Sequence, residues 1–172
     1  MKMVPILIAC LALAGCGVAH AAGIRLTSAA VGVDGRIAAR QSAHGQNLSP
    51  PLSWSGGAGA KTYAIVLEDS DAPGARPFVH WLVWNIPGAM TSLAEGRVPA
   101  GAAQGANDAG GTGYFGPRPP SGVHHYHFKI FALDGTLALA AGADRAALSR
   151  AMNGHVLAGG ELVGTFAAPG AR

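Results

Sequence analysis

Residues 114–131 read YFGPRPPSGVHHYHFKIF. Glycine and proline dominate the first part of this stretch, and an apolar run with aromatic residues fills the second part and continues to residue 133. A cluster of turn residues followed by such a run is typical of a loop that leads into a β-strand. The stretch therefore predicts a strand over 124–133, preceded by loops over 96–122.

The same punctuation recurs along the chain, which has 26 glycines and 11 prolines in 172 residues. Short apolar runs between these turn residues predict further strands. The predicted strands are 24–30 and 36–38, then 62–68 (TYAIVLE), 79–86 (VHWLVWNI) and a short last strand over 162–166 (LVGTF). One peripheral helix is expected between Asp144, a residue type that caps helix N-termini, and Asn153-Gly154, a pair that ends helices. The fold class is therefore mainly β, in one domain.

The first 21 residues have the features of a secretory signal: one lysine, an apolar run and then small residues. Two cleavage positions compete. The sequence LAGC at 13–16 resembles a lipobox, in which Cys16 is lipidated and becomes the first mature residue. The sequence AHA at 19–21 resembles an ordinary cleavage site before Ala22. Both interpretations predict an exported protein, either periplasmic or lipid-anchored in the cell envelope, with residues 22–172 as one domain.

The composition argues against cysteine-based chemistry and against nucleic-acid binding. Both cysteines, Cys10 and Cys16, lie in the predicted signal, so the mature domain has no disulfide and no thiol nucleophile or metal ligand. Charged residues make up 12% of the chain, about half the usual share, and no basic run is present, which argues against nucleic acid as a partner. Membrane contact is expected only through a lipid anchor, and the oligomeric state stays open.

Polar residues gather where the predicted strands begin and end. Asp69 and Asp71 follow one strand, and His80 opens the next. Each has an ordinary alternative: an Asp-x-Asp before Ala-Pro commonly caps a turn, and a lone histidine in an apolar strand is commonly a core residue. For Asp71 the turn and a ligand-binding role are equally supported.

Alternation along the predicted strand divides its histidines between two faces. His124 shares one face with Tyr126 and Phe128. His125 and His127 share the other face with Lys129, so we expect that face to meet solvent and the two histidines to be exposed polar residues and not metal ligands.

Five segments together resemble the phosphatidylethanolamine-binding protein family, in particular its bacterial Raf-kinase-inhibitor-like branch. They occur in compatible order over nearly the whole mature chain. They are NLSPPLSW (47–54), DSDAP (69–73), HWLV with NIP (80–87), GAND with GYFGPRPPSGVHHYHF (105–128), and GHVLA with ELVGT (154–165). The resemblance departs from the family pattern at Ser70, where proline is usual, and at His125, where arginine is usual.

This resemblance implies an antiparallel β-sandwich-like fold with Greek-key connections and one or two small helices. It also implies a small pocket at the sheet rim that binds phosphate or another phosphorylated or anionic ligand, such as a phospholipid head group, without catalysis and without a cofactor. Carried over by position, the ligand-binding residues are Asp69, Asp71, His80, Arg118, Pro119, His124 and Tyr126, with Phe78 at the edge. For the Arg118 side chain, anion binding and simple exposure are equally supported.

The residue types suit this chemistry. Histidine rings, a tyrosine hydroxyl and a backbone N–H at Arg118 can converge as donors on phosphate oxygens. Asp69 is expected to orient a histidine. Two alternatives remain: a metal-assisted hydrolase in which Asp69, His80 and His124 bind zinc, or a module that modulates an envelope protein.

Overall fold

The computed structural model describes residues 23–170. The predicted signal, its two cleavage positions and Cys16 lie outside these residues. Within the described range, no helix is long and apolar enough to cross a membrane.

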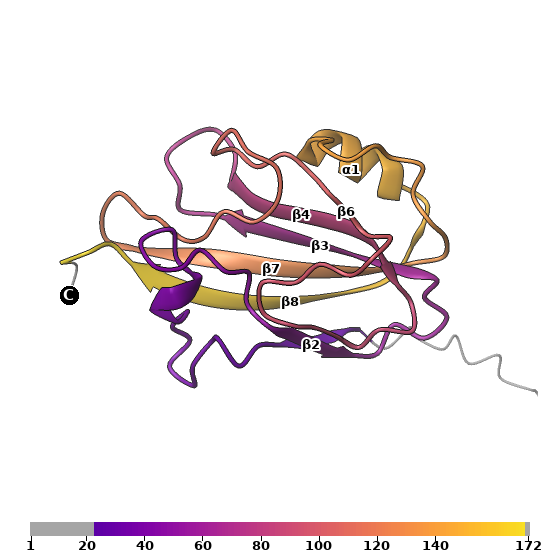
Figure 1. Cartoon of the computed structure of the whole chain (residues 1–172), viewed down its shortest axis with the longest axis horizontal. Helices are drawn as coiled ribbons and strands as arrows, with labels where there is room; N and C mark the ends of the chain where they lie inside the picture. The colour runs from indigo at the N-terminus through magenta and orange to yellow at the C-terminus, as the bar shows by residue number, and fades with distance from the viewer. Residues whose placement is uncertain (1–22, 171–172) are drawn as a thin grey trace, which may run out of the picture.

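Two antiparallel sheets form the molecule, as predicted for a mainly β fold (Figure 1). The larger sheet has five strands in the order β6-β4-β3-β7-β8, and the smaller has the order β1-β2-β5. In chain order the elements are β1 (Arg25–Thr27), the 3-10 turn η1 (Ala39–Gln41), β2 (Leu52–Ser55), β3 (Thr62–Asp69), β4 (Phe78–Pro87), β5 (Ser92–Leu93), β6 (Ala103–Gln104), β7 (Val123–Leu133), α1 (Arg145–Met152) and β8 (Val156–Ala167).

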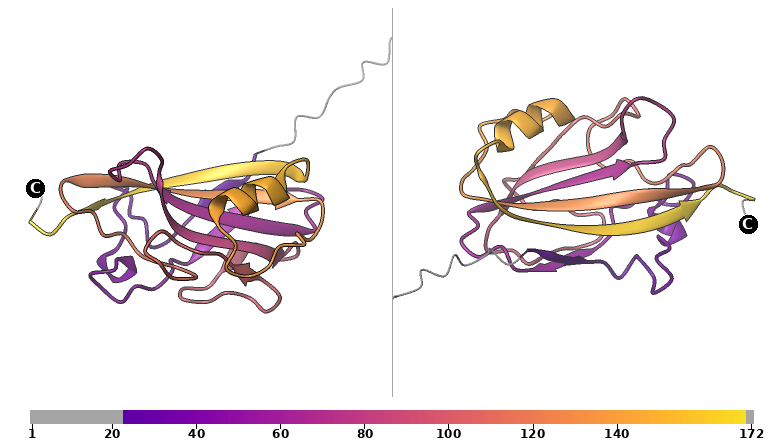
Figure 2. Two further views of the ribbon diagram at one scale, coloured as in Figure 1. Left: turned by 90° about the horizontal axis from the view of Figure 1, so that it is seen from above. Right: turned by 180° about the vertical axis from the view of Figure 1, so that it is seen from behind.

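The large sheet is covered on both faces. The small sheet lies against one face, and α1 packs on the other, as the two views of Figure 2 show. Side chains that alternate along β3 serve both layers: Tyr63, Ile65 and Leu67 join the core under the small sheet, while Ala64 and Val66 join the core under α1. For this reason all eight residues of β3 are buried.

Three predicted strands are confirmed as β3, β4 and β7, whereas the predicted strand 24–30 is shortened to β1. The helix begins after Asp144, whose side chain accepts a hydrogen bond from the Ala147 N–H. The prediction for the last strand was too short, because β8 already begins at Val156. Two adjacent glycines in its first half hide the strand from a hydrophobic pattern. Gly160 is required there, since a Cβ atom at this position would lie 1.9 Å from the Ile24 carbonyl oxygen.

Two further predictions differ from the structure. Residues 36–38 form only isolated bridges, one of them from Arg36 to Thr165, and β2 was not predicted. The face of β7 that carries Lys129 is only partly open to solvent, because Lys129 pairs with the buried Glu68 at 2.8 Å beneath α1.

The first described residues join the large sheet at one end of β8. The Ile24 N–H donates to the Gly159 carbonyl at 2.9 Å, and β1 continues from there along β2. The loops that carry the polar sequence motifs lie at the other end of the strands, where β3 ends and β7 begins.

Candidate functional site

A pocket of about 280 Å³ opens at this other end of the large sheet, and we call it the rim pocket. Its walls come from the ends of β3, β4 and β7 and from the loops before β4 and β7. The lining residues are Asp69, Ala72, Pro73, Phe78, His80, Phe115, Arg118, Pro120 and His124.

His80 reaches the pocket because of a β-bulge. In the pairing of β3 with β4, Leu67 lies opposite Trp81 and Glu68 opposite Val79, so His80 is an extra residue on β4. A bulge turns the extra side chain to the same face as its neighbour. His80 therefore lies on the face of Trp81, at the end of the core under the small sheet.

The His80 ring is held tightly. Its Nδ1 lies 2.7 Å from the carbonyl oxygen of Phe115, whose ring stacks on the imidazole at 5.7 Å. Phe78 and Tyr126 approach the ring at centroid distances of 4.8 and 5.2 Å. Burial lowers the pKa of His80, and the Phe115 carbonyl and the Asp69 charge oppose this only in part. The ring is therefore neutral at neutral pH.

His124 is held by a carboxylate. Its Nδ1 lies 2.8 Å from Asp69 Oδ2, and both side chains are almost completely buried. The other carboxylate oxygen of Asp69 accepts from the Asp71 N–H at 2.9 Å. Asp69 thus fixes the orientation of one histidine and the first turn of the loop after β3.

Tyr126 lies beneath the pocket and not on its surface. Its hydroxyl is fully buried and makes no hydrogen bond of regular geometry within the part of the chain that the structure describes, although the Asp69 carboxylate and the Arg118 backbone N–H lie close to it. Burial raises the pKa of Tyr126, and the nearby Asp69 charge raises it further. The protein thus keeps a protonated hydroxyl next to Asp69 without a hydrogen bond of regular geometry.

Of the seven residues expected to bind ligand, the structure places Asp69, His80, Arg118 and His124 on the pocket wall. Arg118 is exposed at the mouth, Pro119 is buried outside the lining and Tyr126 lies below it. The Asp71 side chain points away: its Oδ2 accepts from the backbone N–H and the Nδ1 of His125 at 2.6 and 2.7 Å. The Asp71 side chain thus holds the start of β7 and not the turn, because the carboxylate that accepts from the turn belongs to Asp69.

Four wall residues were not among the predicted ligand-binding residues, namely Ala72, Pro73, Phe115 and Pro120, and Phe115 makes the most important contact of these. The only available signal was an aromatic residue inside the glycine- and proline-rich loop of residues 114–122. Its carbonyl sets the tautomer of His80, and no sequence pattern reveals a backbone contact of this kind.

The outer face of β7 carries its own hydrogen-bonded pairs of histidine and carboxylate. His125 pairs with Asp71, and His127 Nδ1 lies 2.9 Å from Glu161. His125 is exposed and His127 is half-buried. Within residues 23–170, no group of three or more histidine, cysteine or acidic residues is arranged to hold a metal ion, so Asp69, His80 and His124 do not form such a group.

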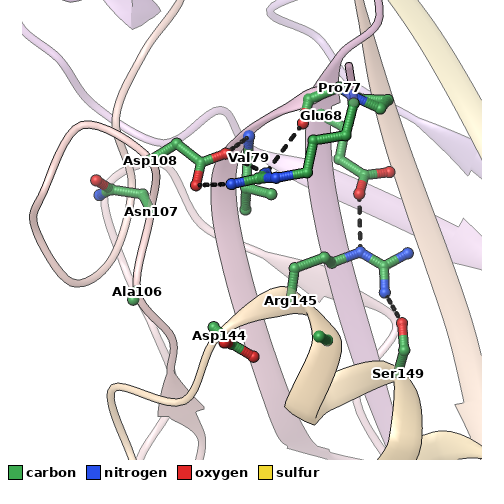
Figure 3. Close-up of a pocket in the computed structure, with 11 residues that line it drawn as sticks. Glu68, Pro77, Val79, Ala106, Asn107, Asp108, Asp144, Arg145 and Ser149 are labelled. Atoms are coloured by element: carbon green, nitrogen blue, oxygen red, sulfur yellow. Dashed lines mark hydrogen bonds and ion pairs between the residues drawn. The ribbon is translucent and has the colours of Figure 1, made fainter. Parts of the chain in front are cut away.

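A second cavity of about 340 Å³ lies on the opposite face of the sheet, between β3, β4 and α1 (Figure 3). Four of its five charged side chains are paired with one another, and the fifth, Asp144, caps α1. Glu68 accepts from Arg145 at 2.8 Å, and Asp108 accepts from Arg76 at 2.7 Å and from the Val79 N–H. These pairs connect α1 and the loop before β4 to the sheet, and they leave few groups for a ligand.

Comparisons with known proteins agree with this geometry. A family model described as phosphatidylethanolamine-binding protein matches residues 27–167. A UPF0098 protein of Methanothermobacter thermautotrophicus is 47% identical over 138 residues, which cover 77% of this chain and 91% of the relative. A Mycobacterium tuberculosis protein named as a lipoprotein, LppC, is 42% identical over 127 residues, covering 73% of this chain and 63% of that protein.

Two solved structures are similar over most of their length. A phosphatidylethanolamine-binding protein homologue from Chlamydia trachomatis has a TM-score of 0.78 and 38% identity, covering 84% of this chain and 97% of its own. YbcL of E. coli, described as a new member of the mammalian family of that name, has a TM-score of 0.78 and 31% identity, with 85% and 99% covered.

Proposed function

The chain belongs to the phosphatidylethanolamine-binding protein family, and from this premise we propose that its rim pocket binds the phosphoryl group of a small anionic ligand without chemical change. The observation that carries the proposal is the arrangement of two histidines. Both rings use Nδ1 for a protein partner, which leaves both Nε2 atoms for a ligand between β4 and β7.

The pocket is preformed, because each ring is held by a short hydrogen bond and by packing. Prolines stiffen the walls at Pro73 and Pro120. A ligand therefore orders few side chains when it binds, and this favours affinity for a small molecule. A volume of about 280 Å³ is near the lower limit for ligand pockets, so it suits a head group or a free phosphate ester and not an acyl chain.

The charged side chains around the pocket have different roles in the proposed binding of an anion. The Arg118 guanidinium at the mouth attracts anions. The Asp69 carboxylate already accepts from His124 and from the Asp71 N–H, so it acts as an orienting group and not as a contact for the anion. The Tyr126 hydroxyl, buried beneath the pocket floor, is a further side-chain donor, and we expect it to reach a phosphate oxygen when the ligand binds.

We also propose that the protein is exported, with Cys16 as the lipid-bearing residue or with cleavage before Ala22. The supporting observations are the sequence of the first 21 residues and a relative named as a lipoprotein. Labelling of cells with a radioactive fatty acid distinguishes the two, since Cys16→Ser abolishes labelling only if the lipobox is used.

The binding proposal is tested by titrating inorganic phosphate and phosphoethanolamine into the protein and following the histidine ring signals by NMR. We expect saturable shifts at His80 and His124, and loss of saturable binding in His124→Asn. The matched control is His155→Asn, which removes an exposed histidine that also pairs with a carboxylate, Asp134. Absence of any shift at His80 and His124 would contradict the proposal.

A further inference from the structure

Ser70 continues the pairing of β3 with β7 by one residue beyond Asp69, because its N–H donates to the His125 carbonyl at 3.2 Å. Side chains alternate along a strand, so Ser70 points to the face of Glu68 and not to the face of the rim pocket. Ser70 is exposed there. Its hydroxyl therefore belongs to a part of the surface that the binding proposal does not use.

Three side chains on this face form a continuous chain of hydrogen bonds across the neighbouring strands β3, β7 and β8 (Figure 1). Ser70 Oγ lies 3.1 Å from His127 Nε2, and His127 Nδ1 lies 2.9 Å from Glu161 Oε1. On β3 the residue opposite His127 is Glu68, two positions before Ser70. On β8 it is Val163, two positions after Glu161. Ser70 and Glu161 are thus diagonal neighbours of His127, and we call the three residues the outer-face triad.

The order of these contacts prepares His127 to act as a general base. An ionised Glu161 carboxylate only accepts hydrogen bonds, so in the neutral His127 ring the proton is on Nδ1. Nε2 then carries a lone pair, and the Ser70 hydroxyl donates to it. A hydroxyl within about 2.6–3.2 Å of a base, with the base oriented by a third group, is the arrangement that activates a serine nucleophile.

The contact with a hydroxyl distinguishes His127 from the other paired histidines. Within residues 23–170, four histidines have a carboxylate at Nδ1, namely His124, His125, His127 and His155. Of these four, only His127 also has a side-chain hydroxyl at Nε2 among the described residues. Ser70 stands where the family pattern has proline, so the outer-face triad is not part of that pattern.

Lys129 and Arg145 place positive charge beside Ser70. Both pair with Glu68 at 2.8 Å, and Glu68 lies two residues before Ser70 on the same face. Two cations and one anion leave this group with a net positive charge. Such a charge stabilises the negative oxygen that develops when a serine attacks a carbonyl group.

We propose that the outer-face triad is a hydrolytic site for short-chain carboxylic esters, separate from the rim pocket. Neither the rim pocket nor the cavity under α1 includes Ser70 in its lining, so a long acyl chain has no enclosed site in either of them. Ser70 and His127 are the catalytic residues. Glu161 is a positioning residue, because it acts on the substrate only through the His127 ring.

The reaction has two steps and needs only water as a second reactant. Ser70 Oγ forms a bond to the ester carbonyl carbon while His127 Nε2 takes the hydroxyl proton. The C–O bond to the alcohol breaks, and His127 gives this proton to the leaving oxygen. Water then attacks the acyl group on Ser70 and gives a proton to His127. The bond between Ser70 Oγ and the acyl carbon breaks, the carboxylic acid leaves, and Ser70 Oγ recovers a proton from His127.

The test uses a fluorophosphonate probe, which reacts covalently with activated serines, and tandem mass spectrometry to locate the label. The internal control is Ser149, an exposed serine that contacts Arg145 and has no histidine partner among the described residues. We expect the label at Ser70 and not at Ser149. Ser70→Ala should lose the label and lower the hydrolysis of p-nitrophenyl acetate by at least about 100-fold. Equal labelling of the two serines, or no label at Ser70, would overturn the proposal.

Variants of His127 test the base. His127→Gln should slow the labelling of Ser70 by about 100- to 10,000-fold, the usual contribution of a general base. Free imidazole should restore part of the rate in His127→Ala, because it can occupy the space of the lost ring. The matched control is His155→Gln, which removes an exposed histidine that pairs with Asp134 but has no hydroxyl contact among the described residues. This control should label at the unaltered rate.

A variant of Glu161 tests the positioning role. Glu161→Gln keeps the shape of the side chain, but its amide can donate to Nδ1 and so favour the His127 tautomer with the proton on Nε2. The ¹⁵N chemical shifts of the His127 ring should report this change, and labelling of Ser70 should slow. An unaltered labelling rate in His127→Gln or in Glu161→Gln would overturn the proposal. If a variant does not fold, the comparison of Ser70 with Ser149 in the unaltered protein still decides the matter.

Discussion

Removing the Tyr126 hydroxyl should raise stability and weaken binding at the same time. The hydroxyl is fully buried and has no hydrogen bond of regular geometry among the described residues, since Asp69 and the Arg118 N–H are near it but poorly aligned. A buried polar group without a partner costs about 1–3 kcal/mol. Tyr126→Phe keeps the ring, and thus its packing against His80, so we expect the free energy of unfolding to rise by about 1 kcal/mol. For a domain of this size the melting temperature would rise by about 2–4 °C.

The same substitution should weaken phosphate binding. A hydrogen bond to a charged group contributes about 1.5–3 kcal/mol, so the dissociation constant should rise by roughly 10- to 150-fold. Thermal melting without ligand and calorimetric titration with phosphate measure the two effects on one sample. Opposite signs for stability and affinity are expected where a group is kept for function.

The matched control is Tyr114→Phe, since the Tyr114 hydroxyl donates to the Gln41 carbonyl at 2.9 Å and lies outside the pocket lining. This variant should lose about 1 kcal/mol of stability and keep its affinity. Our reasoning would be refuted if Tyr126→Phe lowered the melting temperature, or if it left phosphate affinity unchanged.

Three further predictions concern the surroundings of the pocket. Burial alone would raise the pKa of Glu68, but the hydrogen bonds and charges of Lys129 and Arg145 outweigh burial and lower it. Ionised Glu68 therefore stabilises the fold at pH values above its unfolded pKa. This stability is lost as the pH falls through the folded pKa. Glu68→Gln should therefore cost about 3 kcal/mol at neutral pH by urea unfolding and much less in acid, and an equal loss at both pH values would contradict this origin. Gly160→Ala should lower the free energy of unfolding by about 1–3 kcal/mol, because the added Cβ atom meets the Ile24 carbonyl oxygen. The control is Gly159→Ala, whose Cβ atom would have its nearest neighbour at 3.5 Å. It should unfold near the urea concentration at which the unaltered protein unfolds. Asp71→Ala should change the free energy of unfolding by less than about 1 kcal/mol, since the pair with His125 is exposed. It should nevertheless weaken phosphate binding several-fold, because the pocket wall at Ala72 and Pro73 then moves more freely. Unchanged affinity would show that Asp71 does not hold this wall.

The parts of the fold that could be predicted are those in which one local rule decides the outcome. β3 and β4 are continuous apolar runs bounded by turn residues, and Asp144 caps α1 by a local side-chain contact. β8 could not be delimited, because Gly160 is required by the approach of Ile24, a residue more than a hundred positions away. The covered face of Lys129 likewise depends on the position of α1, which strand alternation cannot reveal.

In the site, too, local rules placed some residues correctly, whereas contacts between distant residues could not be predicted. Alternation along β7 placed His124 with Tyr126 on the inner face, and both side chains are buried there. His80 follows no simple alternation, because a bulge turns it inward, so its place came only from the family resemblance. The partners of Asp69 and Asp71 are backbone and side-chain contacts across the sheet, and they required the structure.

The first described residues join the large sheet beside Gly159, and this contact determines at which end of the strands the chain enters the domain. His124 pairs with Phe166 on β8, seven residues from Gly159, and a strand rises about 3.3 Å per residue. Residue 24 and the rim pocket are therefore separated by about 23 Å along the strands. The chain thus enters the described domain at the end of the strands opposite the rim pocket, so a ligand reaches the pocket without passing the entry point of the chain.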